Sequence, residues 1–379
     1  MRKLLSLVLA LTLALSFAGV AVAEEKPTIT IWTTGSQNLS DLFTELCEVY
    51  NAQPDAQYTA KLQFILSGTG DEGMSDRLAA AYLTGQTNTD FDLIAENTSS
   101  FQGMIDEAGS EDLFLDLDFS KVEGYENVTV EPSTFADKLV PYRLTTVVFA
   151  YDSARIPEEE LPHTWDELYD WIAAHPGRFA YNEPDTGGAG SSFVQSAVYR
   201  LIEDKSAMVS TDEKWIDEYG PGLEWLASIH PYLYQSGGGV LYPNKNQGTL
   251  DLLINQEVDM IPAWADQILT NVEAGTLPET TAMYQLDDWA LTGTDVSFAI
   301  PSIGSNPEGA YDFISFVISP EGQKICLENM KAVPVIDTDL IESDSKELVA
   351  SLSDFNYISI GTLWSDHLYQ MWQEQILPL

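Results

Sequence analysis

The sequence predicts an α/β protein of two lobes, and three observations predict it. Strand, small polar loop and helix follow one another repeatedly along the chain. This order restarts after a long apolar strand over 142–151. The chain has 379 residues, which is too long for one ordinary hydrophobic core. Because parallel strands need helical crossovers between them, the repeated order favours parallel sheets.

The first group of elements follows from hydrophobic periodicity. A β-branched strand opens it and ends in the small polar turn 33–36. Apolar residues at helical spacing follow, and then an alternating strand. The expected elements are strands at 28–32, 58–66 and 91–95 and helices at 39–50 and 74–83. Each strand is followed by small or polar residues, as expected where loops lead into helices.

The second group has the same order after the apolar strand. Thr164 is expected to cap a helix over 165–174, with Glu167 completing a capping box. The other expected elements are strands at 179–181, 258–262 and 296–301 and helices at 192–202, 248–255 and 310–318. The part from residue 337 is acidic and predicted to be helical.

The first 23 residues have the pattern of a secretory signal peptide. Arg2 and Lys3 precede an apolar run that ends in Ala21-Val22-Ala23. Residues 1–23 are therefore expected to be removed, leaving a secreted protein with no stable membrane insertion. The run has no cysteine near its end for lipid attachment, which favours a periplasmic over a Gram-positive extracellular location.

The charge of the chain excludes several classes of partner. Its formal net charge is −42, and because residues 1–23 hold two basic and no acidic side chains, the remainder stands at −44. Nucleic acid is excluded as a partner, since phosphate backbones are bound by Lys and Arg. Such a charge attracts cations and keeps a secreted protein soluble.

Two cysteines, Cys47 and Cys326, lie far apart in the sequence. Outside the cytoplasm they are compatible with one disulfide, which spacing alone does not decide. No Cys–Cys or Cys–His cluster has the spacing of a metal site, so neither metal nor cofactor is expected. The four histidines and the absence of a Gly-x-Ser-x-Gly elbow give no catalytic motif, and no enzyme activity is expected.

Three segments resemble the extracellular solute-binding proteins of ATP-driven importers, which have the two-lobed type 2 periplasmic-binding fold. The first is the strand 29–32. The second is LPHTWDEL at 161–168, which is similar to the family's opening of the second lobe. The third is GAYDFISFVISPEGQ at 309–323, which is similar to a late helix pair of the family. Segment 179–193 also resembles the branch with thiamine and polyamine binders.

The resemblance implies several hinge crossings, at 145–149 and 297–301, and a ligand cleft between the lobes. Lobe 1 would hold residues 24–146 and 296–335, and lobe 2 would hold 147–295 and 336–379. Both cysteines would then lie in lobe 1. The implied function is capture of a small solute by a monomeric protein, which closes on it and delivers it to a membrane permease.

Ligands of open α/β sheets bind at the carboxyl ends of strands, and this rule selects the candidate loops. The candidate ligand-binding residues are Thr34, Gly35, Ser36, Ser67, Gly68, Thr69, Glu96, Asn97, Asp185, Thr186, Gly187, Gly188, Ser191, Trp264 and Asp266. None of them is expected to be catalytic or to bind a metal.

Several of these residues have a structural alternative. The loop 67–70 is compatible with an anion site or with a tight turn, and Asp71 and Glu72 disfavour an anion. Loop 185–191 is compatible with ligand contact or with a serine cap on the next helix. Trp32 and Trp264 are compatible with a cleft or a core position. Arg143 is compatible with holding a ligand carboxylate, but a salt bridge to a neighbouring acid is expected.

The predicted solute is a cation or zwitterion, such as thiamine or a polyamine. Glu96, Asp185 and Asp266 beside aromatic residues suit such a ligand by charge and stacking. A sugar stacked on tryptophan is the nearest alternative. A secreted sensor or adhesion module and a secreted hydrolase are the other functions compatible with the sequence.

Overall fold

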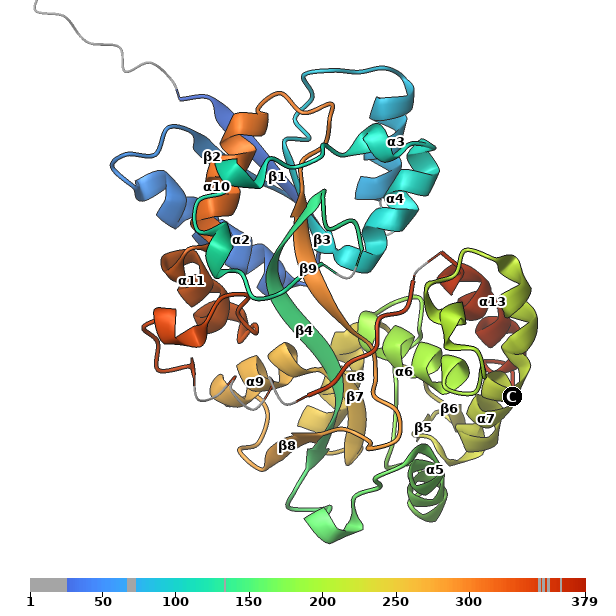
Figure 1. Cartoon of the computed structure of the whole chain (residues 1–379). Coiled ribbons are helices and arrows are strands. Elements are labelled where there is room, and N and C mark those ends of the chain that lie inside the picture. Colours follow the sequence, from blue (N-terminus) through green and yellow to red (C-terminus); the bar gives the residue numbers. More distant parts are fainter. Residues whose placement is uncertain are drawn as a thin grey trace, which may run out of the picture.

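The computed structural model describes residues 26–66, 73–132, 134–346, 349, 352, 355–361 and 363–379. They form two lobes that are joined by long strands (Figure 1). This confirms the predicted two-lobed α/β class. The predicted signal peptide, residues 1–23, lies outside the described residues. Among the described helices, none combines the length and the apolar character that crossing a membrane requires.

One mixed sheet runs through both lobes, with strand order β2-β1-β3-β9-β4-β7 and β8 paired to β4. A separate hairpin joins β5 to β6. The strands are β1 (Thr28–Gly35), β2 (Thr59–Leu66), β3 (Leu93–Asn97), β4 (Leu139–Asp152), β5 (Gln235–Ser236), β6 (Gly239–Val240), β7 (Met260–Trp264), β8 (Thr281–Tyr284) and β9 (Gly293–Ala299).

The strand β4 is the main connection between the lobes. Its first part, from Leu139 to Thr146, pairs with β9, and its second part, from Val147 to Asp152, pairs with β7 and β8. The pairing is parallel between β1 and its neighbours β2 and β3, but antiparallel for β9, β4, β7 and β8. The prediction of parallel sheets is therefore wrong for the crossing strands, which return through the hinge in opposite directions.

Helices cover the sheet in each lobe. The helices are α2 (Gln37–Ala52), α3 (Met74–Leu83), α4 (Phe101–Ala108), α5 (Trp165–Ala174), α6 (Gly188–Tyr199), α7 (Gly220–Ile229), α8 (Lys245–Ile254), α9 (Ala265–Glu273), α10 (Pro307–Ile318), α11 (Pro320–Met330) and α13 (Ser365–Gln375). In the first lobe, α2, α10 and α11 pack on one face of the sheet and α3 and α4 on the other (Figure 1).

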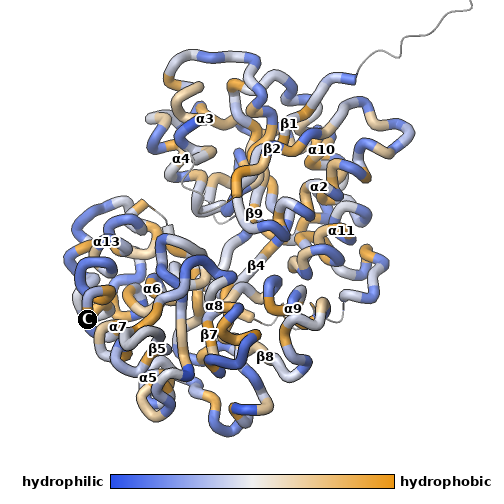
Figure 2. The backbone as a smooth tube through the Cα atoms, turned by 180° about the vertical axis from the view of Figure 1, so that it is seen from behind, coloured by the Kyte–Doolittle hydropathy of each residue, from blue (hydrophilic) through white to orange (hydrophobic). Residues whose placement is uncertain are grey.

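Residues of each strand alternate between these two faces. In β3, Leu93 and Ala95 pack in the core under α2 and α10, whereas Ile94 packs under α3 and α4. This is the period of two that a strand buried on both sides requires. Apolar segments gather inside both lobes (Figure 2), and the second lobe has its own two clusters of buried residues.

The last part of the chain does not follow a simple division into lobes. Ile336 and Ile341, which the sequence places in lobe 2, pack in the first-lobe core. Ile358 then pairs with Thr292 beside the crossing strands, and α13 packs in the second lobe. The exact lobe boundaries stay a prediction.

Local signals explain where several elements begin. Helix α3 has the predicted bounds, and α5 begins after Thr164, whose Oγ1 accepts a hydrogen bond from the Glu167 N–H at 3.2 Å. The Glu167 carboxylate accepts from the N–H of His163 at 2.7 Å, one residue before the expected partner. The predicted strand 179–181 is reduced to one bridge between Phe179 and Met260.

The two cysteines and Trp32 are core residues. Cys47 and Cys326 are both buried in the first-lobe core and both are free, so no disulfide joins them. Burial raises the pKa of both thiols to about 12, which keeps them protonated and unreactive. Trp32 stacks on Phe91 and donates to the Asp90 carbonyl at 2.9 Å, so its alternative as a cleft residue is wrong.

Candidate functional site

A cavity of about 520 Å³ lies where β1, β3 and β7 end, and residues of both lobes line it. The structure brings together ten of the residues that the sequence predicted. They are Thr34, Gly35, Ser36, Glu96, Asn97, Thr186, Gly187, Gly188, Trp264 and Asp266. The carboxyl-end rule therefore locates this cavity, because those residues follow the ends of the neighbouring strands β1 and β3, lie at the end of β7, or lie at the start of a helix.

The other predicted residues have different positions. Ser67, Gly68 and Thr69 lie outside the described residues. Asp185 is exposed and accepts a hydrogen bond from Gln373 at 2.8 Å, away from the cavity. Ser191 bonds to the hydroxyl of Tyr369. Asp185 and Ser191 are thus not brought to the cavity.

Glu96 forms the first-lobe wall together with the end of β1. Because β1 and β3 are parallel neighbours, Thr34 lies beside Glu96 and donates its hydroxyl to Oε2 at 2.7 Å. The backbone N–H of Asn97 donates to Oε1 at 3.0 Å. Burial raises the pKa of Glu96, although these two donors and Arg143 oppose the shift. The carboxylate is held in place and faces the cavity.

The second-lobe wall is built from the N-termini of α6 and α8. Asn246 Oδ1 accepts from the N–H of Ala189 at 3.0 Å, and Thr186 Oγ1 accepts from the N–H of Lys245 at 2.9 Å. A Cβ on Gly188 would lie 2.8 Å from the indole of Trp264. Glycine is therefore needed here so that α6 can approach the indole closely.

Neither serine of this loop caps α6. The helix begins at Gly188 with Gly187 as its N-cap, so Ser191 and Ser192 lie inside it. Ser192 instead accepts a hydrogen bond from the N–H of Thr292 at 2.8 Å, which ties α6 to the crossing strands. The serine-cap alternative is wrong because the helix begins earlier than the apolar periodicity indicates.

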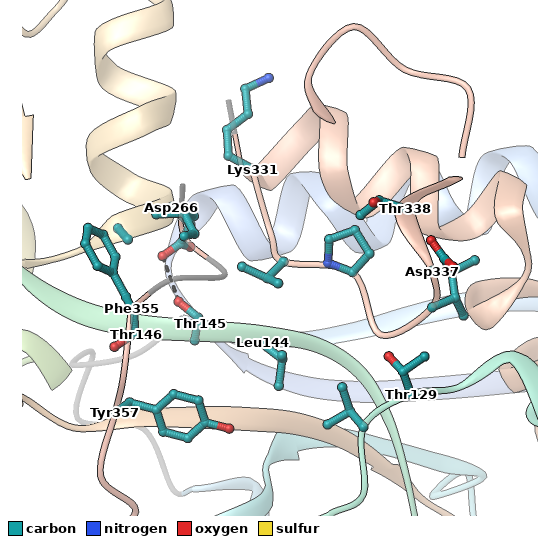
Figure 3. Close-up of a pocket in the computed structure, with 16 residues that line it drawn as sticks. Thr129, Leu144, Thr145, Thr146, Asp266, Lys331, Asp337, Thr338, Phe355 and Tyr357 are labelled. Carbon is teal, nitrogen blue, oxygen red and sulfur yellow. Dashed lines mark hydrogen bonds between the residues drawn. The ribbon is translucent and has the colours of Figure 1, made fainter. Parts of the chain in front are cut away.

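Asp266 and Arg143 form the hinge side of the cavity. Asp266 lies in the first turn of α9 and accepts a hydrogen bond from the Thr145 hydroxyl of β4 at 3.0 Å (Figure 3). Burial raises the pKa of Asp266, with Arg143 and Thr145 opposing the shift. Arg143 lies two residues earlier on β4, is 6% exposed, and has its guanidinium 5.8 Å from the Tyr142 ring.

The expected ion pair of Arg143 is not formed within the described part of the chain. No described carboxylate lies within 4.0 Å of it, and the side chain that interacts with its buried guanidinium is the uncharged hydroxyl of Tyr142. The sequence is compatible with Arg143 as a ligand contact, but an ion pair was preferred, and Arg143 was therefore left out of the candidate residues. The sequence did contain an indication, because an arginine inside a long apolar strand is costly to bury unless a partner compensates its charge.

Four helices begin at this cavity. They are α2, α6, α8 and α9, and their residues Gln37, Gly188, Lys245 and Asp266 line it. None of the four is capped by the side chain of its N-cap residue. Helix N-termini carry partial positive charge and free N–H groups. The sequence did not predict Lys245, Asn246, Gln247 or Gln267 as site residues, because two of these helices begin where periodicity is weak.

Comparison with known proteins decides the family. Residues 48–346 match the model of the bacterial extracellular solute-binding proteins, which is most of the chain. The chain belongs to this family. A search of curated protein sequences finds no match for this solute-binding protein.

Solved structures share the fold of this solute-binding protein at low sequence identity. The spermidine/putrescine ABC transporter substrate-binding protein PotD of Streptococcus pneumoniae is 16% identical, with a TM-score of 0.64 over 93% of this chain and 99% of that chain. A periplasmic thiamin binding protein is 14% identical, with a TM-score of 0.64 over 93% and 96%. Iron-bound HitA of Pseudomonas aeruginosa is 18% identical, with a TM-score of 0.62 over 91% and 99%.

A second cavity of about 420 Å³ lies behind the hinge of this solute-binding protein and shares Thr145 and Asp266 with the first (Figure 3). Its wall mixes apolar residues, such as Leu144 and Phe355, with threonines and the acids Asp266 and Asp337. Its lysine, Lys331, is engaged by Glu273 at 2.7 Å. The first cavity is the better candidate site, because its polar groups come from both lobes and include an arginine without an ion pair.

Proposed function

We propose that this protein is the substrate-capturing subunit of an ATP-driven importer. It binds one small solute in the cavity between the lobes, closes on it, and delivers it to a membrane permease. The observation that supports this most directly is that Glu96 of one lobe and Trp264 and Lys245 of the other line one cavity. A ligand that contacts both lobes stabilises the closed form relative to the open one. No bond is made or broken in this function.

The proposed solute carries a cationic group. Glu96 on the first-lobe wall and Asp266 on the hinge side are acids that line the cavity, and the Trp264 ring offers a face for a cation or an aromatic ring. Thiamine-like and polyamine-like solutes have this chemistry. Proteins of the same fold are described as binding spermidine or putrescine and thiamin, which is consistent with the proposal.

A sugar is the second candidate, and the amide side chains favour it. Asn97, Asn246, Gln247 and Gln267 line the cavity beside Trp264, and amides bind hydroxyl groups well. Iron is less well supported, even though iron-bound HitA has the same fold. Among the described lining residues there is no tyrosine, histidine or cysteine to hold it.

Thermal unfolding with a panel of solutes tests the proposed function. The panel holds thiamine, spermidine, putrescine, sugars, amino acids, inorganic phosphate and ferric iron. A solute at about 100 times its dissociation constant stabilises the folded protein by about 2.7 kcal/mol. A clear shift with one chemical class supports solute capture and names the class. No shift with any class would contradict the function and favour a sensor or a hydrolase.

A further inference from the structure

We infer that the bound solute also carries an anionic group, a carboxylate or a phosphate, which Arg143 binds at the hinge side of the cavity. The inference rests on the proposed function and makes the solute a zwitterion, with its cationic group toward Glu96. On this inference, Arg143 is the residue that selects solutes with an anionic group over solutes without one.

The first argument is the state of the Arg143 guanidinium. The side chain is 6% exposed and lines the cavity. Its buried Nε and Nη1 have no carboxylate or backbone carbonyl as a hydrogen-bond acceptor among the described residues, and the neighbouring Tyr142 hydroxyl that interacts with the guanidinium is uncharged. Buried guanidinium groups are otherwise paired with carboxylates or hydrogen-bonded, because an uncompensated charge is costly to bury. An anionic ligand provides the missing acceptors, in the bidentate geometry that guanidinium prefers.

The second argument is that the nearby acids have other partners. Glu96 accepts from Thr34 and from the N–H of Asn97. Asp266 accepts from Thr145. Both carboxylates act on Arg143 at longer range, but neither lies within 4.0 Å of it. Arg143 is thus kept charged while its N–H groups stay available to a ligand.

The third argument is the local charge of the cavity. The chain has 59 acidic and 17 basic residues, yet the described lining holds two of each, Glu96 and Asp266 against Arg143 and Lys245. The N-termini of α6 and α8 add partial positive charge on the Lys245 side. A solute with cationic groups alone would meet this positive charge unpaired. A solute with anionic groups alone would meet Glu96 and the negative field of the whole protein.

A series of four-carbon compounds tests the inference without any variant. Putrescine, 4-aminobutyrate and succinate share one chain length. Putrescine carries two cationic groups, 4-aminobutyrate carries one group of each sign, and succinate carries two anionic groups. Thiamine against thiamine monophosphate, and 4-aminobutyrate against O-phosphoethanolamine, distinguish a phosphate from a carboxylate. Affinities are measured by calorimetry on the exported protein, purified after expression of the full chain.

The expected result is that a zwitterionic compound binds at least about tenfold more tightly than its purely cationic or anionic counterpart. Tighter binding of putrescine, thiamine or a sugar overturns the inference and leaves solute capture intact. No binding by any compound of this series or of the unfolding panel overturns both.

A variant pair tests the residue itself. Arg143→Gln is expected to weaken zwitterion binding by about 10-fold to 100-fold and to abolish the preference over the cationic counterpart. Arg143→Lys should recover part of the affinity. Lys61→Gln, which removes an exposed charge on β2, is the matched control and should change neither the affinity for the zwitterion nor the preference over the cationic counterpart. Circular dichroism confirms that each variant is folded, and unchanged binding by folded Arg143→Gln overturns the assignment.

Discussion

At the scale of single residues, Glu96 has a different environment from an acid on the protein surface. It is an acid at the end of a buried strand, and burial raises its pKa even though Thr34 and Asn97 donate to it. A pKa that is higher in the folded than in the unfolded protein makes the folded state less stable as pH rises through that folded value. Glu96 therefore costs stability at neutral pH, as expected for a group placed there for binding.

Glu96→Gln is expected to stabilise the ligand-free protein in a pH-dependent way. At about pH 3 and below, Glu96 is protonated in both states, and the variant should differ little from wild type. Toward about pH 7 the variant should gain stability, by about 1.4 kcal/mol for each unit by which the folded pKa is raised. Thermal unfolding at both pH values measures this.

Glu45→Gln is the matched control for this experiment, because Glu45 is exposed on α2 and the substitution makes the same change of net charge. Its effect on stability should be nearly the same at the two pH values. If the stability difference between Glu96→Gln and wild type were the same at both pH values, the raised pKa of Glu96 would be contradicted.

At the scale of elements, close contact between α6 and Trp264 at the end of β7 forms part of the second-lobe wall. A Cβ at Gly188 would lie 2.8 Å from Trp264 Cζ2 and 3.0 Å from its Nε1. The sequence pattern located the loop that leads into α6, because Gly187 and Gly188 follow a polar stretch and precede the apolar part of the helix. It did not locate the first helical residue, because Gly and Ser carry no hydrophobic periodicity.

Gly188→Ala is expected to displace the indole, to destabilise the protein by about 1–3 kcal/mol, and to weaken solute binding. Gly103→Ala is the matched control, since Gly103 is also helical and a Cβ added there would meet no neighbouring side chain or strand within 4 Å. That control should stabilise by about 0.5–1 kcal/mol through backbone entropy. Chemical denaturation measures the free energy of unfolding of both variants. A Gly188→Ala variant more stable than wild type would contradict the close packing of Gly188 against Trp264.

The hydrogen bond between β4 and α9 is the second element-scale contact. Thr145→Val removes the donor to Asp266 and is expected to cost about 1.5–3 kcal/mol, because the buried carboxylate loses a partner. Thr146→Val changes the neighbouring buried threonine, which bonds to the adjacent Val147 carbonyl at 3.3 Å. The free energy of unfolding should fall much less in that control. An equal loss of unfolding free energy in the two variants would show that the hydrogen bond to Asp266 does not stabilise the protein more than the bond of Thr146.

At the scale of the whole molecule, sequence reasoning predicted what local patterns encode and missed what tertiary contacts decide. The strands at 28–32 and 91–95 and the helix at 74–83 follow from periodicity, and the carboxyl-end rule then placed Thr34, Glu96 and Trp264 at one cavity. The antiparallel pairing of the crossing strands was missed, because strand direction is set by the route of the chain. The unpaired state of Arg143 was missed because it depends on distances between separate elements.

We propose that a solute binds between the two lobes and draws them together. The distance between spin labels on introduced cysteines at Glu45 of α2 and Glu224 of α7, both exposed, measures this most directly. The native cysteines are buried, so the labels report the introduced sites. We expect the distance to shorten when the solute identified by the unfolding panel is added, and to stay long in Arg143→Gln at the same concentration. An unchanged distance in the wild-type protein while the solute is bound would contradict the account.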